Sequence, residues 1–173
     1  MQHQLIITFL GADKVGILGE IANLVCNLKC NILDSRQAHY GEDFSLTLIL
    51  EGSLASITRA EFEIPQLSQK LDLLCMVKRT KQHNKQHLVH LADVEFHGKD
   101  AVGIIKDITQ FFVDHNIQIN AFRQKTEGQD DSRSVECKMV VSMPQALPFE
   151  TIKPLFEAFV QKYDLEGSIV KKN

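Results

Sequence analysis

The sequence predicts an α+β protein of two tandem ferredoxin-like units, each an antiparallel sheet with the element order βαββαβ. Two observations carry this prediction. Residues 5–37 recur without a gap as residues 92–124, and the apolar pattern switches repeatedly between a strand period of 2 and a helical period of about 3.6. Units of this order place both helices on one face of the sheet. The chain is therefore one structural unit used twice.

The repeat is clearest in a loop, which reads FLGADKVGIL at residues 9–18 and FHGKDAVGII at residues 96–105. Identities continue into the flanking helix and strand. The identical pairs are Phe9/Phe96, Gly11/Gly98, Asp13/Asp100, Val15/Val102, Gly16/Gly103, Ile17/Ile104, Ile21/Ile108, Ile32/Ile119, Arg36/Arg123 and Gln37/Gln124. Because the loop occurs twice in the same context, it is expected to define the fold or a site.

The repeat divides the chain into a first domain at residues 1–80, a polar linker at 81–87 and a second domain at 88–173. Domains of this size cover only roughly 60% of the surface that their unfolded chains expose. We therefore expect further burial between the halves or between chains, and a homo-oligomer.

In the first domain, alternating apolar residues predict strands and a spacing of three to four residues predicts helices. Pro65 is expected to start or kink the second part of the second helix, because proline removes a helical donor. The expected elements are a strand at 4–10, a helix from Val15 to Lys29–Asn31, strands at 31–40 and 44–50 joined by a turn at 41–43, a helix at 54–71 and a strand at 73–79.

The second domain repeats this order. Its clearest strand alternates Val135, Cys137, Met139 and Val141 with polar or smaller residues, which is typical of a half-buried strand. The expected elements are a strand at 88–97, a helix at 102–114, strands at 117–126 and 134–143, a helix at 149–162 and a strand at 165–171.

The helices leave one face of each predicted sheet open. Ile6, Ile49 and Val140 are expected on these open faces. Proteins rarely leave a large apolar patch exposed, so the other repeat, another chain or both should cover them.

Composition excludes several classes of protein. The 19 Lys and Arg against 22 Asp and Glu give a net charge of −3, so we expect no direct nucleic-acid binding. No segment approaches the roughly 20 apolar residues of a membrane span and no secretory signal is present, which predicts a cytoplasmic protein with no membrane partner. The cysteines form no CxxC pair and are expected to be reduced, buried thiols; they are Cys26, Cys30, Cys75 and Cys137.

The repeated loops have the chemistry of an anion site. Unpaired N–H groups at the start of a helix carry partial positive charge and suit a small carboxylate. Asp13 and Asp100 could pair with an ammonium group, so donors and acceptor together suit an amino acid. The expected N–H donors are those of Val15, Gly16 and Ile17 in the first copy and of Val102, Gly103 and Ile104 in the second.

The loops can also be interpreted as purely structural, without a ligand. Asp13 and Asp100 are well placed as N-caps, which need no ligand, and the glycines can serve backbone conformation or close packing. Both interpretations can hold at once. The string GxDxxG differs from the dinucleotide fingerprint GxGxxG, and a hairpin at residues 31–51 stands where a parallel crossover is needed. Dinucleotide binding is therefore not expected.

Other polar groups give weaker signals. The pairs Arg36-Gln37 and Arg123-Gln124 either reach a ligand or a facing domain, or are exposed ends of a strand. His83, His87 and His90 have a helical spacing of metal ligands, but they run from the linker into a strand, so no metal or other cofactor is expected. No nucleophile, base and orienting group form a recognisable set, which predicts a protein that is not an enzyme.

In their strand and helix context, the loops at residues 11–18 and 98–105 resemble those of ACT domains, small regulatory modules that bind amino acids. In such domains the ligand lies near this loop at a domain interface. The copies differ at Ala12/Lys99, Lys14/Ala101 and Gly19/Lys106, so one loop can bind while the other serves structure. The ligand-binding residues that the resemblance implies are Gly11, Asp13, Val15, Gly16, Ile17, Gly98, Asp100, Val102, Gly103 and Ile104.

The close tandem is similar to the bacterial family of glycine cleavage system transcriptional repressors. This resemblance implies a non-enzymatic regulator that responds to a small amino acid, glycine in particular, and represses transcription through a DNA-bound activator protein. Two alternatives stay open: a ligand-independent interaction module that docks a partner, and a detached regulatory subunit of a metabolic enzyme.

Overall fold

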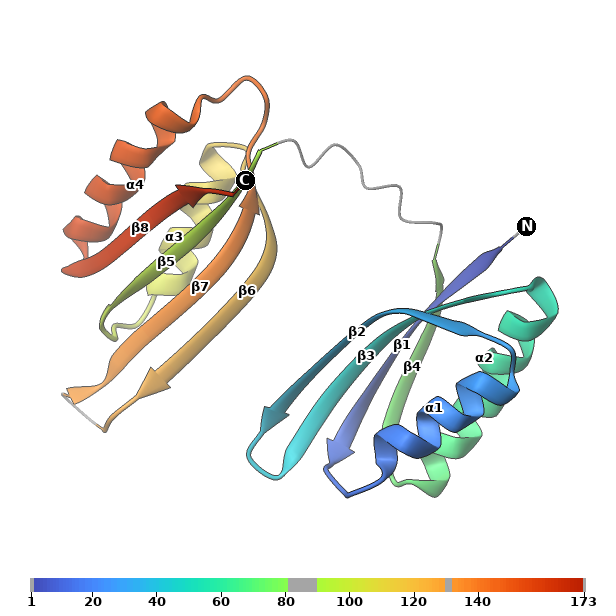
Figure 1. Ribbon diagram of the computed structural model, residues 1–173. Helices are drawn as coiled ribbons and strands as arrows, with labels where there is room; N and C mark the ends of the chain where they lie inside the picture. Colours follow the sequence, from blue (N-terminus) through green and yellow to red (C-terminus); the bar gives the residue numbers. More distant parts are fainter. Residues whose placement is uncertain (1, 81–89, 130–131, 173) are drawn as a thin grey trace. The chain divides into compact units, whose positions relative to one another are not determined.

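The computed structural model describes residues 2–80, 90–129 and 132–172 (Figure 1). The chain divides into two compact units at residues 1–84 and 85–173. The predicted linker at 81–87 lies outside the described residues, as do His83 and His87 and the first two residues of the strand predicted at 88–97.

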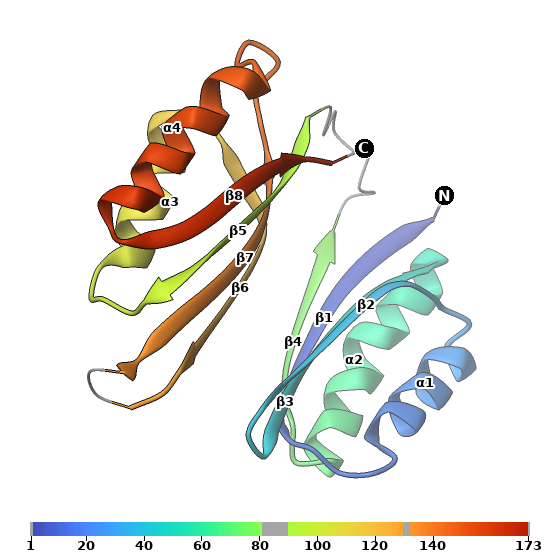
Figure 2. The ribbon, with the colours of Figure 1, turned by 60° about the vertical axis from the view of Figure 1, so that its left-hand side comes forward.

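The first unit has the predicted order βαββαβ. Its strands form one antiparallel sheet in the order β2-β3-β1-β4. Figure 2 shows both helices on one face of this sheet and no helix on the other. The elements are β1 (His3–Ala12), α1 (Ile17–Asn27), β2 (Asn31–Tyr40), β3 (Asp43–Gly52), α2 (Leu54–Lys70) and β4 (Leu74–Thr80).

The second unit repeats the arrangement with the strand order β6-β7-β5-β8. The predicted α+β class, with two ferredoxin-like βαββαβ units in tandem, is confirmed. The elements are β5 (Leu91–Lys99), α3 (Ile104–Asp114), β6 (Gln118–Glu127), β7 (Ser134–Ser142), α4 (Phe149–Lys162) and β8 (Leu165–Lys171). None of the helices in the described ranges is long and apolar enough to cross a membrane.

Three helix predictions need correction. The helix expected from Val15 begins at Ile17, and the helix expected from residue 102 begins at Ile104. A glycine with positive φ precedes each start and ends the non-helical loop there. Pro65 does not start a separate second part of the helix, because α2 runs unbroken from Leu54 to Lys70. The Ser53 side chain caps α2 by accepting a bond of 3.1 Å from the Ser56 N–H.

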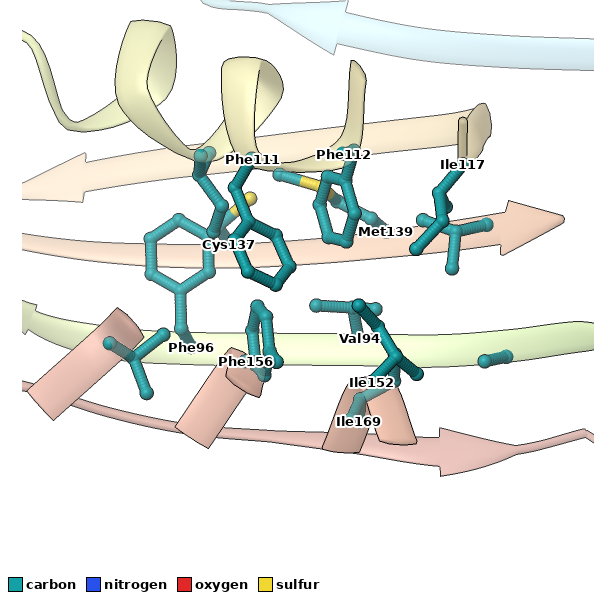
Figure 3. Close-up of a cluster of buried hydrophobic side chains, with 14 of the residues drawn as sticks. Val94, Phe96, Phe111, Phe112, Ile117, Cys137, Met139, Ile152, Phe156 and Ile169 are labelled. Atoms are coloured by element: carbon teal, nitrogen blue, oxygen red, sulfur yellow. The ribbon is translucent and has the colours of Figure 1, made fainter. Parts of the chain in front are cut away.

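The two cores differ in their side chains although the backbones correspond. The first is mainly aliphatic, with Phe9 and Phe44 as its only fully buried aromatic rings among the described residues. The second is rich in phenylalanine (Figure 3), and the rings of Phe112 and Phe156 stack with centroids 6.1 Å apart. The same fold therefore accommodates two different ways of filling its interior.

The open faces agree with the prediction at the three named residues. Ile6, Ile49 and Val140 are partly exposed, whereas the alternate residues on the same strands are buried. The neighbours of these residues differ strongly between the two sheets.

Candidate functional site

The loops between the first strand and first helix of each unit share one backbone design. The Asp13 N–H donates to the Glu42 carbonyl at 3.0 Å, and the Asp100 N–H donates to the Arg133 carbonyl at 2.9 Å. Each loop is thereby tied to the connection between the next two strands. The repeated sequence thus produces a repeated and anchored loop.

Gly11 and Gly98 are required for packing. A Cβ atom on Gly11 would lie 2.8 Å from Leu73 Cδ2, and one on Gly98 would lie 2.7 Å from Leu165 Cδ2. Real Cβ atoms do not approach so closely, so a side chain at either position would displace the end of that leucine side chain, and it would also lie only 3.2 Å from the Asp72 or Asp164 carbonyl oxygen. These two predicted site residues therefore position the loop through close packing.

Gly16 and Gly103 immediately precede the two helices and have a backbone conformation that favours glycine. Their φ angles are 99° and 97°, in the left-handed region that glycine adopts most readily. The following residues, Ile17 and Ile104, are each only 4% exposed and anchor the helix start in the core. The backbone interpretation of these glycines is confirmed, and the two isoleucine side chains face away from solvent.

Neither helix start has a side-chain cap. In α1, the first-turn N–H groups of Leu18 and Gly19 therefore keep their donor capacity. The prediction of three free loop donors was wrong at one position in each copy, because the Ile17 N–H donates to the Lys14 carbonyl at 3.3 Å and the Ile104 N–H to the Ala101 carbonyl at 3.4 Å. The site that remains is an uncapped and partly positive helix terminus.

Val15 and Val102 stand out from the tips of the loops. Both side chains are fully exposed, whereas valine is usually buried. Neither contributes to a core. Each side chain is therefore available for contact with a ligand or a partner.

The capping interpretation of the aspartates was wrong. The caps are Gly16 and Gly103, and Asp13 instead directs its carboxylate to the edge strand β2, where Oδ2 lies 2.9 Å from His39 Nε2. Within the described part of the chain, the Asp100 carboxylate has no hydrogen-bond or ion-pair partner. The aspartates are therefore available for another role.

A short polar chain distinguishes the first loop. His39 Nε2 also lies 3.3 Å from Gln37 Nε2, so Gln37, His39 and Asp13 form a row from β2 to the loop. The side chains of Asp13 and His39 are 43% and 56% exposed. The row is open to solvent, and Asp13 Oδ1 is free to accept from a ligand among the residues that the structure describes.

The second loop has different neighbours. Thr126 replaces the histidine, and the Gln124 Nε2 donates to its hydroxyl at 3.2 Å. The carboxylate of Asp107, in the first turn of α3, accepts a bond of 3.0 Å from the Tyr163 hydroxyl and lies 4.0 Å from where a Cβ on Gly103 would be. This bond raises the pKa of Tyr163. A fixed negative charge at this helix start disfavours a second carboxylate there.

The repeated Arg-Gln pairs split between two faces of the sheet. Gln37 pairs across β3 with buried Leu46 and so faces the helices, whereas Arg36 pairs with Thr47 on the open face. The Arg36 Nε lies 3.5 Å from Asp34 Oδ2 on its own strand. In the first sheet only Gln37 therefore lies on the side where His39 and Asp13 meet. In the second sheet Gln124 pairs with buried Cys137 and Arg123 with Lys138, which gives the same division between faces.

The remaining predictions concern thiols and metals. All four cysteines are free, and Cys30 and Cys137 are buried, with burial raising the pKa of Cys137 to about 11. Cys26 is exposed and Cys75 is intermediate, so the prediction of burial was wrong for Cys26. Among the described residues, which include only His90 of the three histidines, no cluster could hold a metal ion.

Sequence reasoning missed His39, Asp107 and Tyr163. His39 stands two residues after Gln37, so strand alternation places both on one face, and this spacing was the available signal. The contact between Asp107 and Tyr163 joins residues 56 apart and has no local signature.

Comparison with known proteins agrees with this architecture. The family model described as ACT domain matches residues 3–78, which is the first unit. The glycine cleavage system transcriptional repressor of Escherichia coli (strain K12) is 31% identical over 170 residues, which cover 97% of this chain and 90% of the relative. The chain belongs to the family of glycine cleavage system transcriptional repressors, which contain ACT domains.

Solved structures extend this agreement to the fold of this repressor family. A crystal structure provisionally named a glycine cleavage system transcriptional repressor is 29% identical, covers 100% of this chain and 99% of its own, and has a TM-score of 0.76. A protein from Galdieria sulphuraria at 15% identity, with full coverage of both chains and a TM-score of 0.80, shows the shared fold alone. Membership of the family supports an amino-acid-responsive regulator, and the Escherichia coli relative is named as a transcriptional repressor.

Proposed function

We propose that this protein is a non-enzymatic sensor in which the loop of the first domain binds a small amino acid and thereby alters its affinity for a regulatory protein. Glycine is the proposed ligand, and a DNA-bound transcription activator is the proposed partner. The observation that carries the proposal is the uncapped start of α1 at the end of the loop that also holds the Asp13 carboxylate.

The two charges of an amino acid match this site. The ligand carboxylate would accept from the free N–H groups of Leu18 and Gly19, where the helix dipole favours negative charge. The ligand ammonium would donate to Asp13 Oδ1, because Oδ2 is already held by His39. Fully exposed Val15 would be partly covered by the ligand or by the partner.

The first loop suits this ligand better than the second. Glu20, which corresponds to Asp107, has no hydrogen-bond or ion-pair partner in the described residues and is free to turn away from the helix start. Nothing lies within 4 Å of where a Cβ on Gly16 would be, so this approach is open. Asp107 is held in place by Tyr163, and its charge would oppose a carboxylate at α3.

Two further points support glycine and a protein partner. Glycine carries only the two charged groups that the loop can recognise, and the relatives are named for the glycine cleavage system. The net charge of −3 is unfavourable for direct contact with DNA. A ligand regulates the partner only by binding two states of this protein with different affinity.

Titration calorimetry tests the binding step. Glycine, serine and alanine are titrated into the full chain and into Asp13→Asn and Asp100→Asn, which change corresponding residues. We expect glycine to release heat with the wild type, and Asp13→Asn to weaken binding by roughly tenfold or more through loss of a charged hydrogen bond. Asp100→Asn should bind as the wild type does.

Melting temperatures of the same variants separate binding from stability. Neither aspartate caps a helix, so both variants should melt close to the wild type. No heat with any of the amino acids from a folded sample would contradict sensing. Equal loss of affinity in both variants would assign the site to both loops.

A further inference from the structure

The contact between His39 and Asp13 ties the loop of the first domain to the edge strand β2. His39 Nε2 lies 2.9 Å from Asp13 Oδ2 and 3.3 Å from Gln37 Nε2, so the ring lies between the strand and the loop. An ionised carboxylate can only accept a hydrogen bond, so Nε2 carries the proton in this contact. The contact therefore fixes which ring nitrogen is protonated when the ring is neutral.

The other ring nitrogen can exchange a proton with water. Among the described residues Nδ1 of His39 has no hydrogen-bond partner, and the side chain is 56% exposed. Histidine is the side chain that ordinarily changes its charge between about pH 5 and 8. His39 can thus gain a positive charge at Nδ1 without losing its bond to Asp13.

Asp13 is the charged group that such a proton would act on. It is the only carboxylate in the described chain that pairs with His39, and β3 places apolar Phe44 opposite the histidine. The other charged residues of the loop, the hairpin turn and the first turn of α1 make no hydrogen bond or ion pair with His39 in the described ranges; they are Lys14, Glu20, Glu42 and Asp43.

We propose that His39 is a proton-dependent clamp, which holds the Asp13 carboxylate more tightly when its ring is charged and thereby lowers the affinity of the loop for an amino acid. The effect on affinity rests on the proposed function. The charged ring and the ligand ammonium would be attracted to one carboxylate and would repel each other. Because such coupling is reciprocal, binding of the amino acid would release a proton from His39.

The second domain offers two natural comparisons for this clamp. In its loop, Thr126 stands where His39 stands in the first domain and cannot gain a charge in this pH range. Outside its loop, His97 Nε2 lies 3.3 Å from a Glu166 carboxylate oxygen, in another exposed pair of histidine and carboxylate. A loop without the histidine and a histidine outside the loops can therefore be compared within one chain.

Nuclear magnetic resonance of the full chain, without added amino acid, tests the clamp. We expect the amide signal of Asp13 to shift as the pH falls from about 8 to 5, and that of Asp100 to stay nearly constant. The shift should vanish in His39→Gln, which keeps a neutral donor for Asp13, and persist in the matched control His97→Gln. An Asp13 signal that does not follow the pH, or that follows it equally in His39→Gln, would overturn the clamp.

Titration calorimetry with glycine at both ends of this pH range tests the effect on binding. The Asp13 and His39 side chains are 43% and 56% exposed, so solvent screens their charges. We therefore expect the wild-type dissociation constant to rise by only roughly three- to fivefold from about pH 8 to 5. It should not change with pH in His39→Gln, and it should change as in the wild type in His97→Gln.

Proton release gives a second measure of the same coupling. Near neutral pH, the heat of glycine binding to the wild type should depend on the ionisation enthalpy of the buffer, and this dependence should be lost in His39→Gln. Glycine binding that ignores pH in the wild type, or that keeps its pH dependence in His39→Gln, would leave sensing intact and overturn the role of His39. No heat at any pH from a folded sample would contradict glycine sensing instead, and the Asp13 amide signal would still decide whether His39 is a clamp.

Discussion

The first-domain loop and the second-domain loop have nearly the same backbone but different polar neighbours. Both are held by a close-packed glycine and a second glycine with positive φ. The first adds His39 beside its aspartate, whereas the second adds a carboxylate fixed by Tyr163 at the helix start. The repeat therefore preserves the glycines that the fold requires. The polar neighbours, which could make one loop a binding site and the other not, are not repeated.

The largest expected effect tests whether the two cores stabilise their domains separately. Phe112 and Val25 are corresponding residues and both are buried. Phe112→Ala removes a ring that stacks on Phe156 and should destabilise the second domain by about 3–5 kcal/mol. Val25→Ala removes two methyl groups and should destabilise the first domain by about 1.5 kcal/mol. Hydrogen exchange read separately for each domain measures both changes.

The expectation that each core stabilises only its own domain would be contradicted if the two domains unfolded together. In that case Phe112→Ala would lower protection in the first domain as much as in the second. Loss confined to the second domain would establish two independent folding units and would justify interpreting loop variants domain by domain.

An intermediate effect tests the close packing of the loops. Gly11→Ala and Gly98→Ala should each destabilise by about 1–3 kcal/mol, because the added Cβ meets Leu73 or Leu165 at less than 3 Å. Gly19→Ala is the control, since it lies in α1 with nothing within 4 Å of its Cβ position, and it should stabilise by about 0.5–1 kcal/mol. Urea denaturation measures all three. If Gly11→Ala were neutral, that glycine would be released from its packing role and could be assigned to a ligand.

Much of the fold could be predicted from the sequence because it depends on local pattern. The alternation of apolar and polar residues correctly predicted β7, and the apolar stripe at helical spacing correctly predicted α1. However, α1 and α3 each begin two residues later than expected. The apolar pattern continues through Val15 and Val102, and only the backbone angle of the following glycine excludes them from the helix.

The candidate site was less predictable because its contacts are not local. Asp13 precedes a helix as an N-cap would, and its actual partner His39 lies 26 residues later on the edge strand. The difference between the neighbours of the open-face residues in the two sheets was hidden for a similar reason. It depends on which residues of β4 and β8 pair with β1 and β5, and those strands fall outside the repeat that the sequence displays.

The smallest expected effect is a pH dependence of the first domain that comes from one ion pair between β4 and α2. Arg79 on β4 donates to Glu61 on α2 at 2.6 Å and to the Thr58 hydroxyl at 3.0 Å. The hydrogen bond from Arg79 lowers the pKa of Glu61. A carboxylate whose folded pKa is lowered adds stability above its unfolded pKa of about 4.3, and this stability is lost as pH falls through the lowered folded pKa.

Arg79→Gln should therefore melt below the wild type at neutral pH and approach it as the solution is acidified below about pH 4. Lys171 occupies the corresponding place on β8 and has no side-chain partner among the described residues, so Lys171→Gln is the control. Thermal melts between neutral and acidic pH measure both differences. If the Arg79→Gln difference stayed constant with pH, its contribution would come from Thr58 and from packing of the long side chain. A matching pH dependence in Lys171→Gln would show that the effect follows from net charge and belongs to neither domain in particular.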